Sequence, residues 1–468
     1  MKKADRNKNK NKKEAKRKLP PFKILSTTAI LGYGFPESSF RRGLSRQPDL
    51  IAADAGSSDP GPYYLGAGKS FTNRTAVKRD LRLMIKAGVE KNIPVIIGSA
   101  GGSGARPHLE WCLDIVREIA REEKLHFKLG IARADVEKQT VKKALKKGEV
   151  KPLPFVPELT PEIVDQTENI VAQMGVEPFI KLLQEGCQVI VAGRSYDPAV
   201  FAALPIALGY DPGLAFHLGK ILECAAIAAT PGSGSDCALG ILEEDSFILE
   251  ALSPERKFTP QSAAAHTLYE KSDPYELPGP GGVINLRECR FEDIGNGRVL
   301  VSGSKFIPSE QYWIKLEGVR LIGYRAISVA GVRDPIMISK IDDILKAVEL
   351  RAREIMGREA EQGQIFFHVY GKDGVMGKLE PVKKTQSHEL GLVIEAIGPT
   401  QEAADALLAV TRSALLHYGY EGRIATAGNL AFPFSPSDVA MGKVFEFSVY
   451  HLMKLEDQGI FKTEAEKL

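Results

Sequence analysis

The stretch IPVIIGSAGGSGARPHLEWCLDIVREIAREEK, residues 93–124, decides the fold. It opens with a short β-branched run, passes through a glycine-rich turn, and continues with apolar residues that recur every three or four positions. A buried strand followed by an amphipathic helix produces this pattern. Repeated strand–helix units pack as a parallel sheet with helices on its faces.

The same unit recurs on both sides of this stretch. A second amphipathic run occupies residues 74–92, and further helical patterns lie around residues 199–228. The other strand-like runs are FKILSTTAI (22–30), DLIAADA (49–55), HFKLGIARA (126–134) and CQVIVAG (187–193). This alternation predicts an α/β fold with a doubly wound, mainly parallel sheet.

Beyond residue 228 strand-like runs follow one another with few helices between them. They are CALGILEED (237–245), GGVINLREC (281–289), RVLVSGSKF (298–306), YWIKLEGVRLIGYRAISVAG (312–331) and IMISK (336–340). We expect an annexed antiparallel β region, a helix at 340–357, and a small C-terminal α+β unit. The predicted division is a disordered basic tail at 1–20, an α/β domain with its antiparallel extension at 21–375, and the small domain at 376–468.

Charge and cysteine content restrict the function classes. The formal net charge is +3, but the first 19 residues hold ten Lys/Arg against Asp5 and Glu14, which leaves 52 basic and 57 acidic residues elsewhere. This slightly acidic body argues against a nucleic-acid partner. Five cysteines without CxxC spacing fit a reducing compartment and predict no metal site. With no run near the roughly 18–20 apolar residues of a membrane span, we expect a cytoplasmic protein.

The glycine-rich loop at 98–108 is a candidate anion-binding element. Gly101, Gly102 and Gly104 would let the backbone curl around an anion at a helix N-terminus, and Arg106 would add a positive charge. The loop lacks the GK[ST] of a Walker motif and the third glycine of a dinucleotide-binding fingerprint. The alternative is a strand-to-helix turn without a ligand.

Polar residues also follow two other predicted strands. Asp54 ends the strand at 49–55 and suits acid–base chemistry, whereas Asp59 in the following DPG sequence also fits a plain turn. Arg194 and Asp197 stand directly after CQVIVAG, where the arginine suits a carboxylate or phosphate. The alternative is that Asp197 caps the next helix and pairs with Arg194.

The run FHLGKILECAA, residues 216–226, supplies the remaining catalytic candidates. Helical spacing predicts that His217, Lys220 and Cys224 share a face, as acid–base group, anion partner and nucleophile or ligand. Glu223 is expected off that face and is kept as a further catalytic candidate. The alternative is a structural histidine and a cysteine that acts as a small core residue.

Two longer segments resemble the acyclic terpene utilisation (AtuA) family. They are GRSYDPAVFAALPIALGYDPGLAFHLGKILECAAIAATPGSGSD (193–236) and LLHYGYEGRIATAGNLAFPFSPSD (415–438), and the similarity spans roughly residues 22–438. Asn429 in the second segment is a candidate for substrate or dimer contact. The chain reads Ala225-Ala226 where family members usually read Gly-Ala, which implies a change in pocket size. The resemblance implies a role in the breakdown of branched acyclic terpenoids through CoA thioesters.

The leading hypothesis is therefore an enzyme acting on a small carboxylate or CoA thioester, as a hydratase or dehydratase. Asp, His, Arg and Lys side chains beside anion-binding loops supply the acid and base of such a reaction, and helix N-termini can supply the oxyanion donors. The alternative is a non-catalytic accessory or ligand-binding subunit. The residues indicate no particular cofactor, and the extended antiparallel region favours a homo-oligomer.

Overall fold

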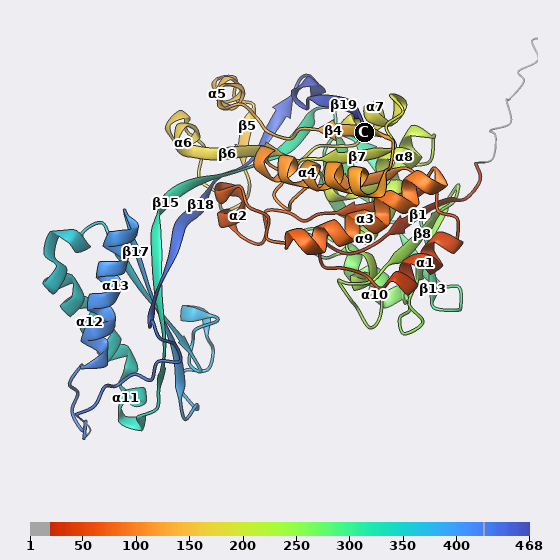
Figure 1. Cartoon of the computed structure of the whole chain (residues 1–468). Helices are drawn as coiled ribbons and strands as arrows, with labels where there is room; N and C mark the ends of the chain where they lie inside the picture. Colours follow the sequence, from red (N-terminus) through yellow and green to blue (C-terminus); the bar gives the residue numbers. More distant parts are fainter. Residues whose placement is uncertain (1–18, 425) are drawn as a thin grey trace, which may run out of the picture.

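The chain forms a large and a small lobe joined by two long strands (Figure 1). The computed structural model describes residues 19–424 and 426–468, without the side chains of Glu359 and Gln458. Within this part of the chain, no helix has both the length and the apolar character needed to cross a membrane. The predicted tail falls almost wholly outside the described residues. At its end, the Pro20 carbonyl accepts a hydrogen bond from Tyr210.

A ten-stranded sheet organises the large lobe, in the order β12-β13-β9-β8-β1-β2-β3-β7-β4-β19. Its five central strands are mutually parallel. They are β1 (Phe22–Ser26), β2 (Leu50–Asp54), β3 (Val95–Gly98), β7 (Val189–Ala192) and β4 (Lys128–Ala132). These are the five predicted strands, so the fold class inferred from the sequence is confirmed.

Helices cover both faces of this sheet because each central strand buries both of its faces. In β2, for example, Leu50 and Ala52 belong to one hydrophobic core while Ile51 and Ala53 belong to the other. The large-lobe helices are α1 (Glu37–Ser45), α2 (Pro62–Ala67), α3 (Arg74–Lys91), α4 (Arg106–Glu123), α5 (Lys138–Lys146), α6 (Pro161–Gln166), α7 (Glu177–Gln184), α8 (Asp197–Ala207), α9 (Pro212–Leu222) and α10 (Pro260–Thr267). Apolar residues of α3 and α4 lie in the second core, and those of α8 and α9 lie in the first. The sheet is therefore doubly wound.

Antiparallel strands extend the sheet at both ends. Beside β1 lie β8 (Ala238–Leu242), β9 (Ser246–Ala251), β13 (Arg298–Ser302) and β12 (Arg290–Asp293), and beside β4 lies β19 (Thr463–Lys467). A separate antiparallel sheet contains β10 (Glu276–Gly279), β11 (Gly282–Asn285) and β14 (Lys305–Pro308). This is the predicted annexed antiparallel region, except that the final strand of the chain also contributes to the main sheet.

The small lobe is built on the far ends of β15 (Tyr312–Val332) and β18 (Asp438–Leu455), which run together out of the large lobe (Figure 1). Their sheet has the order β16-β17-β15-β18-β5, and β6 pairs with the near end of β15. The other strands are β5 (Val150–Pro152), β6 (Thr167–Ala172), β16 (Gln364–Tyr370) and β17 (Leu390–Gly398). The helices are α11 (Pro335–Ser339), α12 (Ile341–Met356) and α13 (Gln401–Leu416).

Two details of this lobe differ from the prediction. Its hydrophobic core already begins at Ala326 and ends at Leu430, so the lobe starts well before residue 376, and β19 returns to the main sheet. The run 336–340, predicted as a strand, lies in α11 and its C-cap, because the Asp334 side chain caps the Met337 N–H at 2.7 Å and Pro335 occupies the first turn.

Candidate functional site

The carboxyl ends of the parallel strands bring together several of the predicted residues. Asp54 ends β2, the glycine-rich loop follows β3, and Arg194 follows β7. Neighbouring parallel strands end at the same edge of a sheet, where α/β folds bind ligands. The C-terminal end of α9 adds two more charges to this edge. We call Asp54, Arg194, Asp197, Lys220 and Glu223 the edge cluster.

Arg194 is the central cation of the edge cluster and is almost fully buried. Its Nη1 donates to Asp197 Oδ1 at 2.7 Å, to the Ser195 carbonyl at 2.7 Å and to Ser99 Oγ at 3.1 Å. Its Nε donates to Glu317 Oε2 at 3.0 Å. The predicted pairing with Asp197 is therefore present, but Asp197 opens the first turn of α8 instead of capping it, since Tyr196 occupies the cap.

Glu317, near the start of β15, is a partner that sequence reasoning missed. Its carboxylate also accepts from Lys315 Nζ and from Gln173 Nε2, both at 3.1 Å. Burial by itself would raise the pKa of Glu317, but Arg194 and Lys315 outweigh burial and hold that pKa at about 2. The sequence signal is a single acidic residue between Leu316 and Gly318, two positions after Lys315 in a strand-like run.

Lys220 and Glu223 form a buried ion pair, with 2.5 Å between Nζ and Oε1. Glu223 Oε2 is buried and has no hydrogen-bond partner among the described residues. Burial, reinforced by Asp197 and partly offset by Lys220, raises the pKa of the Glu223 carboxyl to about 7. Glu223 can therefore hold or release a proton near neutral pH.

Asp54 is a second buried carboxyl with a free oxygen. Its Oδ2 accepts from the Gly56 N–H at 3.0 Å, while Oδ1 is buried and finds no partner within the described chain. Burial raises the pKa of Asp54 well above its ordinary value, and the charges of Asp197 and Glu223 add to this effect. Two carboxyls with raised pKa values at one edge form the acid–base arrangement expected at a catalytic centre.

A segment spanning residues 266–280, which we call the cover segment, lies over the edge cluster. The Tyr269 ring centroid is 5.3 Å from Lys220 Nζ, and His266 stacks on Tyr269 at 5.4 Å. Lys271 Nζ lies 6.0 Å from the ring centroid of Tyr196. The Tyr196 hydroxyl and His266 Nε2 are both buried without a partner in the described structure. None of these four residues was a candidate from the sequence.

Cys224 belongs to the same surroundings but not to the predicted helical face. Helix α9 ends at Leu222, so Cys224 lies in the turn that follows. Burial raises the pKa of its thiol, and Glu223 raises it further. The side chain is therefore a thiol at neutral pH, not the thiolate that nucleophilic catalysis requires.

Comparison with known proteins gives one match. The family model described as "Acyclic terpene utilisation family protein AtuA" matches residues 67–238 and 245–435. The chain belongs to this family. No curated protein and no solved structure matches it. The match includes Arg194, Glu223 and Glu317, whereas Asp54 precedes it. Membership of the AtuA family associates the chain with acyclic terpene utilisation.

The structure does not explain the alanine at position 225, where the resemblance led us to expect glycine. The φ of Ala225 is 45°. This is the left-handed region, which glycine adopts without the steric cost that a Cβ brings. The position is therefore a backbone turn after α9 that glycine suits better than alanine. It fixes the path of the chain next to Glu223.

The structure places His217 of this AtuA-family chain away from the edge cluster. The Thr267 hydroxyl donates to the Ala263 carbonyl at 2.9 Å, so it accepts from His217 Nε2–H, also at 2.9 Å. His217 Nδ1 then accepts from Ser304 Oγ at 2.6 Å. Burial, with a smaller contribution from Lys220, lowers the pKa of His217 to about 3. The ring is neutral and both its nitrogens are occupied.

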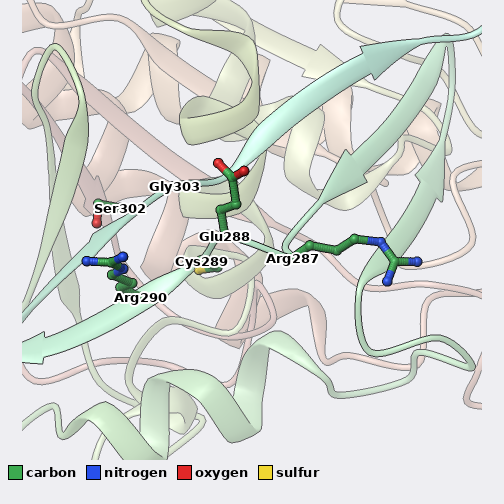
Figure 2. Close-up of a pocket in the computed structure, with 6 residues that line it drawn as sticks. All are labelled: Arg287, Glu288, Cys289, Arg290, Ser302 and Gly303. Atoms are coloured by element: carbon green, nitrogen blue, oxygen red, sulfur yellow. The ribbon is translucent and has the colours of Figure 1, made fainter.

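A separate surface pocket lies beside His217, because Cys289, which lines it, approaches His217 Nδ1 to 3.9 Å. The pocket has a volume of about 490 Å³ and is lined by Arg287, Glu288, Cys289, Arg290, Ser302 and Gly303 (Figure 2). Figure 2 shows Arg287 and Arg290 extending in different directions. The two cations do not converge on a common point, and no member of the edge cluster lines this pocket.

The glycine-rich loop packs closely against the backbone of Arg194 in the edge cluster. A Cβ on Gly104 would lie 2.1 Å from the Arg194 nitrogen, and the Gly104 carbonyl accepts from that N–H at 3.1 Å. A Cβ on Gly101 would likewise clash with His108, and a Cβ on Gly102 would clash with Phe71. The three glycines therefore allow close packing of the loop; no contact with a ligand is needed to explain them.

We predict that Gly104→Ala displaces Arg194 and destabilises the large lobe. The cost combines the left-handed φ of +65° with a steric clash against backbone, and should exceed about 2 kcal/mol. Gly148→Ala is the matched control, because Gly148 has a φ of +71° and nothing within 4 Å of its Cβ position. Urea unfolding of the two variants measures the difference; equal costs would show that the contact with Arg194 is unimportant.

The two remaining candidates lie outside the edge cluster. Arg106 is exposed, and its backbone N–H donates to Asp135 Oδ1 at 2.8 Å, so Asp135 occupies the start of α4. Asn429 lies in the small lobe, where its Nδ2 donates to the carbonyl of Leu415 in the last turn of α13 and to that of Tyr418 just after the helix. Among residues 19–424 and 426–468, no three His, Cys, Asp or Glu side chains are grouped to hold a metal ion.

Proposed function

We propose that the edge cluster is the active centre of an enzyme that adds or removes water at a branched carboxylate or its CoA thioester. The observation that carries this proposal is the pair of buried carboxyls, Glu223 and Asp54, each with an oxygen that forms no hydrogen bond with any described residue. The family membership supports a substrate from acyclic terpene utilisation. The role of the family indicates the kind of substrate, and the acid–base cluster indicates the class of reaction.

The two carboxyls take different roles: Glu223 is the base and Asp54 is the acid. Glu223, with a pKa of about 7, is the base that takes a proton from the carbon next to the carboxyl or thioester carbonyl. The electron pair left on that carbon forms the double bond as the β-hydroxyl departs. Asp54, protonated because burial raises its pKa, gives its proton to the departing hydroxyl, and water is formed. The reverse sequence hydrates the double bond.

The other members of the edge cluster hold this arrangement in place. Lys220 keeps Glu223 Oε1 fixed, so that Oε2 is the oxygen left for the substrate. Arg194 adds a buried positive charge, which lowers the pKa of Asp54 against the effect of burial. The Tyr196 hydroxyl, buried and unpaired in the described chain, is a donor for the negative charge that develops on the carbonyl oxygen.

Proton exchange in D2O tests this function even while the natural substrate is unidentified. The purified protein is incubated with 3-methylbut-2-enoate, 3-hydroxy-3-methylbutanoate and their CoA thioesters, and ¹H NMR follows the protons next to the carbonyl and the interconversion of each pair. We expect protein-dependent deuterium exchange or turnover with at least one compound. Folded protein that exchanges and converts none of them would contradict the proposal and favour an accessory subunit.

A further inference from the structure

Four cations gather at the edge cluster and its immediate neighbours, and three of them have carboxylate partners. Arg194 pairs with Asp197 and Glu317, Lys315 pairs with Glu317, and Lys220 pairs with Glu223. Lys271 is the fourth cation. A half-buried cation without a partner is costly, so this place favours an anion as its ligand.

Lys271 is the cation of this group that remains available. It forms no ion pair with any residue in 19–424 or 426–468 as described, and it is half-buried on the cover segment. Its Nζ faces the ring of Tyr196 at 6.0 Å. Burial lowers the pKa of Lys271, and Lys220 lowers it further, whereas Glu223, Asp197 and Glu270 act in the opposite direction. A ligand anion beside Lys271 would offset both burial and the repulsion from Lys220.

The ring that Lys271 faces carries a second donor without a partner in the described chain, the Tyr196 hydroxyl. The Tyr196 hydroxyl is buried, and the pKa of Tyr196 is raised by burial, so it remains a donor. Gly279, also on the cover segment, packs against the same ring, since a Cβ there would lie 2.7 Å from Tyr196 Cζ. The cover segment thus holds Lys271 and the Tyr196 ring in a fixed relation.

We propose that Lys271 and the Tyr196 hydroxyl bind a free carboxylate group of the substrate. This inference rests on the proposed function, which it narrows from "carboxylate or thioester" to the free acid. A thioester carbonyl carries no net charge and would leave the Lys271 ammonium uncompensated, whereas a carboxylate forms a charge-assisted hydrogen bond with it. The charge of Glu223 acts on both Lys271 and Tyr196, so a carboxylate bound by these two groups would bring its adjacent carbon near the proposed base.

Ligand-induced stabilisation of the full-length protein tests the inference, because a ligand that binds only the native state raises the melting temperature. The probes are 3-methylbut-2-enoate, its neutral amide, and inorganic phosphate, at constant ionic strength. Wild type, Lys271→Gln, Lys271→Arg and the control Lys346→Gln are compared; Lys346 is an exposed lysine on α12 of the small lobe. We expect saturable stabilisation of wild type by the acid but not by the amide.

Lys271→Gln should weaken binding of the acid by at least about tenfold, because a charge-assisted hydrogen bond is lost. Lys271→Arg should restore part of the affinity, and Lys346→Gln should bind like wild type. No saturable effect of the acid on wild type, equal effects of acid and amide, unchanged affinity in Lys271→Gln, or a preference for phosphate would each overturn the inference. Binding of the acid without exchange or turnover would leave it intact and contradict only the proposed function.

Discussion

Glu317→Ala should lower the free energy of unfolding by about 3–5 kcal/mol, the usual effect of removing one partner from a buried ion pair. The Glu317 side chain is 0% exposed and contacts both Arg194 and Lys315. Alanine in its place leaves Arg194 and Lys315 without the carboxylate that they share. The measurement is chemical denaturation of the purified variant at pH 7.

The matched control is Glu446→Ala, which removes the partner of Arg320 at 2.6 Å in an ion pair whose side chains are 35% and 42% exposed. Solvent screens that pair, so the change should be at most about 1 kcal/mol. If both variants lose the same stability, the buried network does not hold the site together.

The pH dependence of the Glu317→Ala effect follows from the lowered pKa of Glu317. A carboxyl whose pKa falls from 4.5 unfolded to about 2 folded contributes stability above pH 4.5 and loses it as the pH falls toward 2. The stability difference between wild type and Glu317→Ala should therefore shrink between pH 4.5 and 2. A constant difference across this range would contradict the ionic origin of the effect.

Glu223→Gln should reduce turnover, or exchange in D2O, by about 10²–10⁴-fold, the range for loss of a general base. Glutamine keeps the size of the side chain and can still accept from Lys220, but it cannot take a proton. Since Glu223 titrates near pH 7, wild-type kcat/KM should rise with pH through about 7, and this rise should be absent from the variant.

Glu255→Gln is the control for this loss, since Glu255 is an exposed residue of the same lobe with the same change of charge. It should retain wild-type activity. Circular dichroism and the melting temperature establish that Glu223→Gln is folded. A folded variant that keeps more than about a tenth of the wild-type rate would show that Glu223 is not the base.

Local sequence patterns were sufficient for the α/β layers. Each central strand is a short, mainly apolar run such as VIIG, and the long helices α3 and α4 show clear helical periodicity. The carboxyl-edge rule then placed Asp54, Arg194 and Asp197 together, because parallel strands end at one edge whatever their order. Lys220 and Glu223 joined them through α9.

The same reasoning could not predict contacts between segments that are far apart in the sequence. Glu317 lies 123 positions from Arg194. The two meet only because β15, a strand of the other sheet, packs against the residues that follow β7. The sequence suggested that His217 is reactive, because its buried partners, Ser304 and Thr267, lie far away in the sequence. The cover segment carries turn residues whose pattern gives no indication that Lys271 faces Tyr196.

A titration of the Glu223 carboxyl tests the central claim most directly. Protein labelled with ¹³C at the glutamate side-chain carboxyl is titrated by NMR, and the Glu223 signal is assigned by its absence from Glu223→Gln. An apparent pKa near 7 is the predicted result. A value near 4.5, that of an ordinary exposed glutamate, would contradict an acid–base centre at this edge of the sheet.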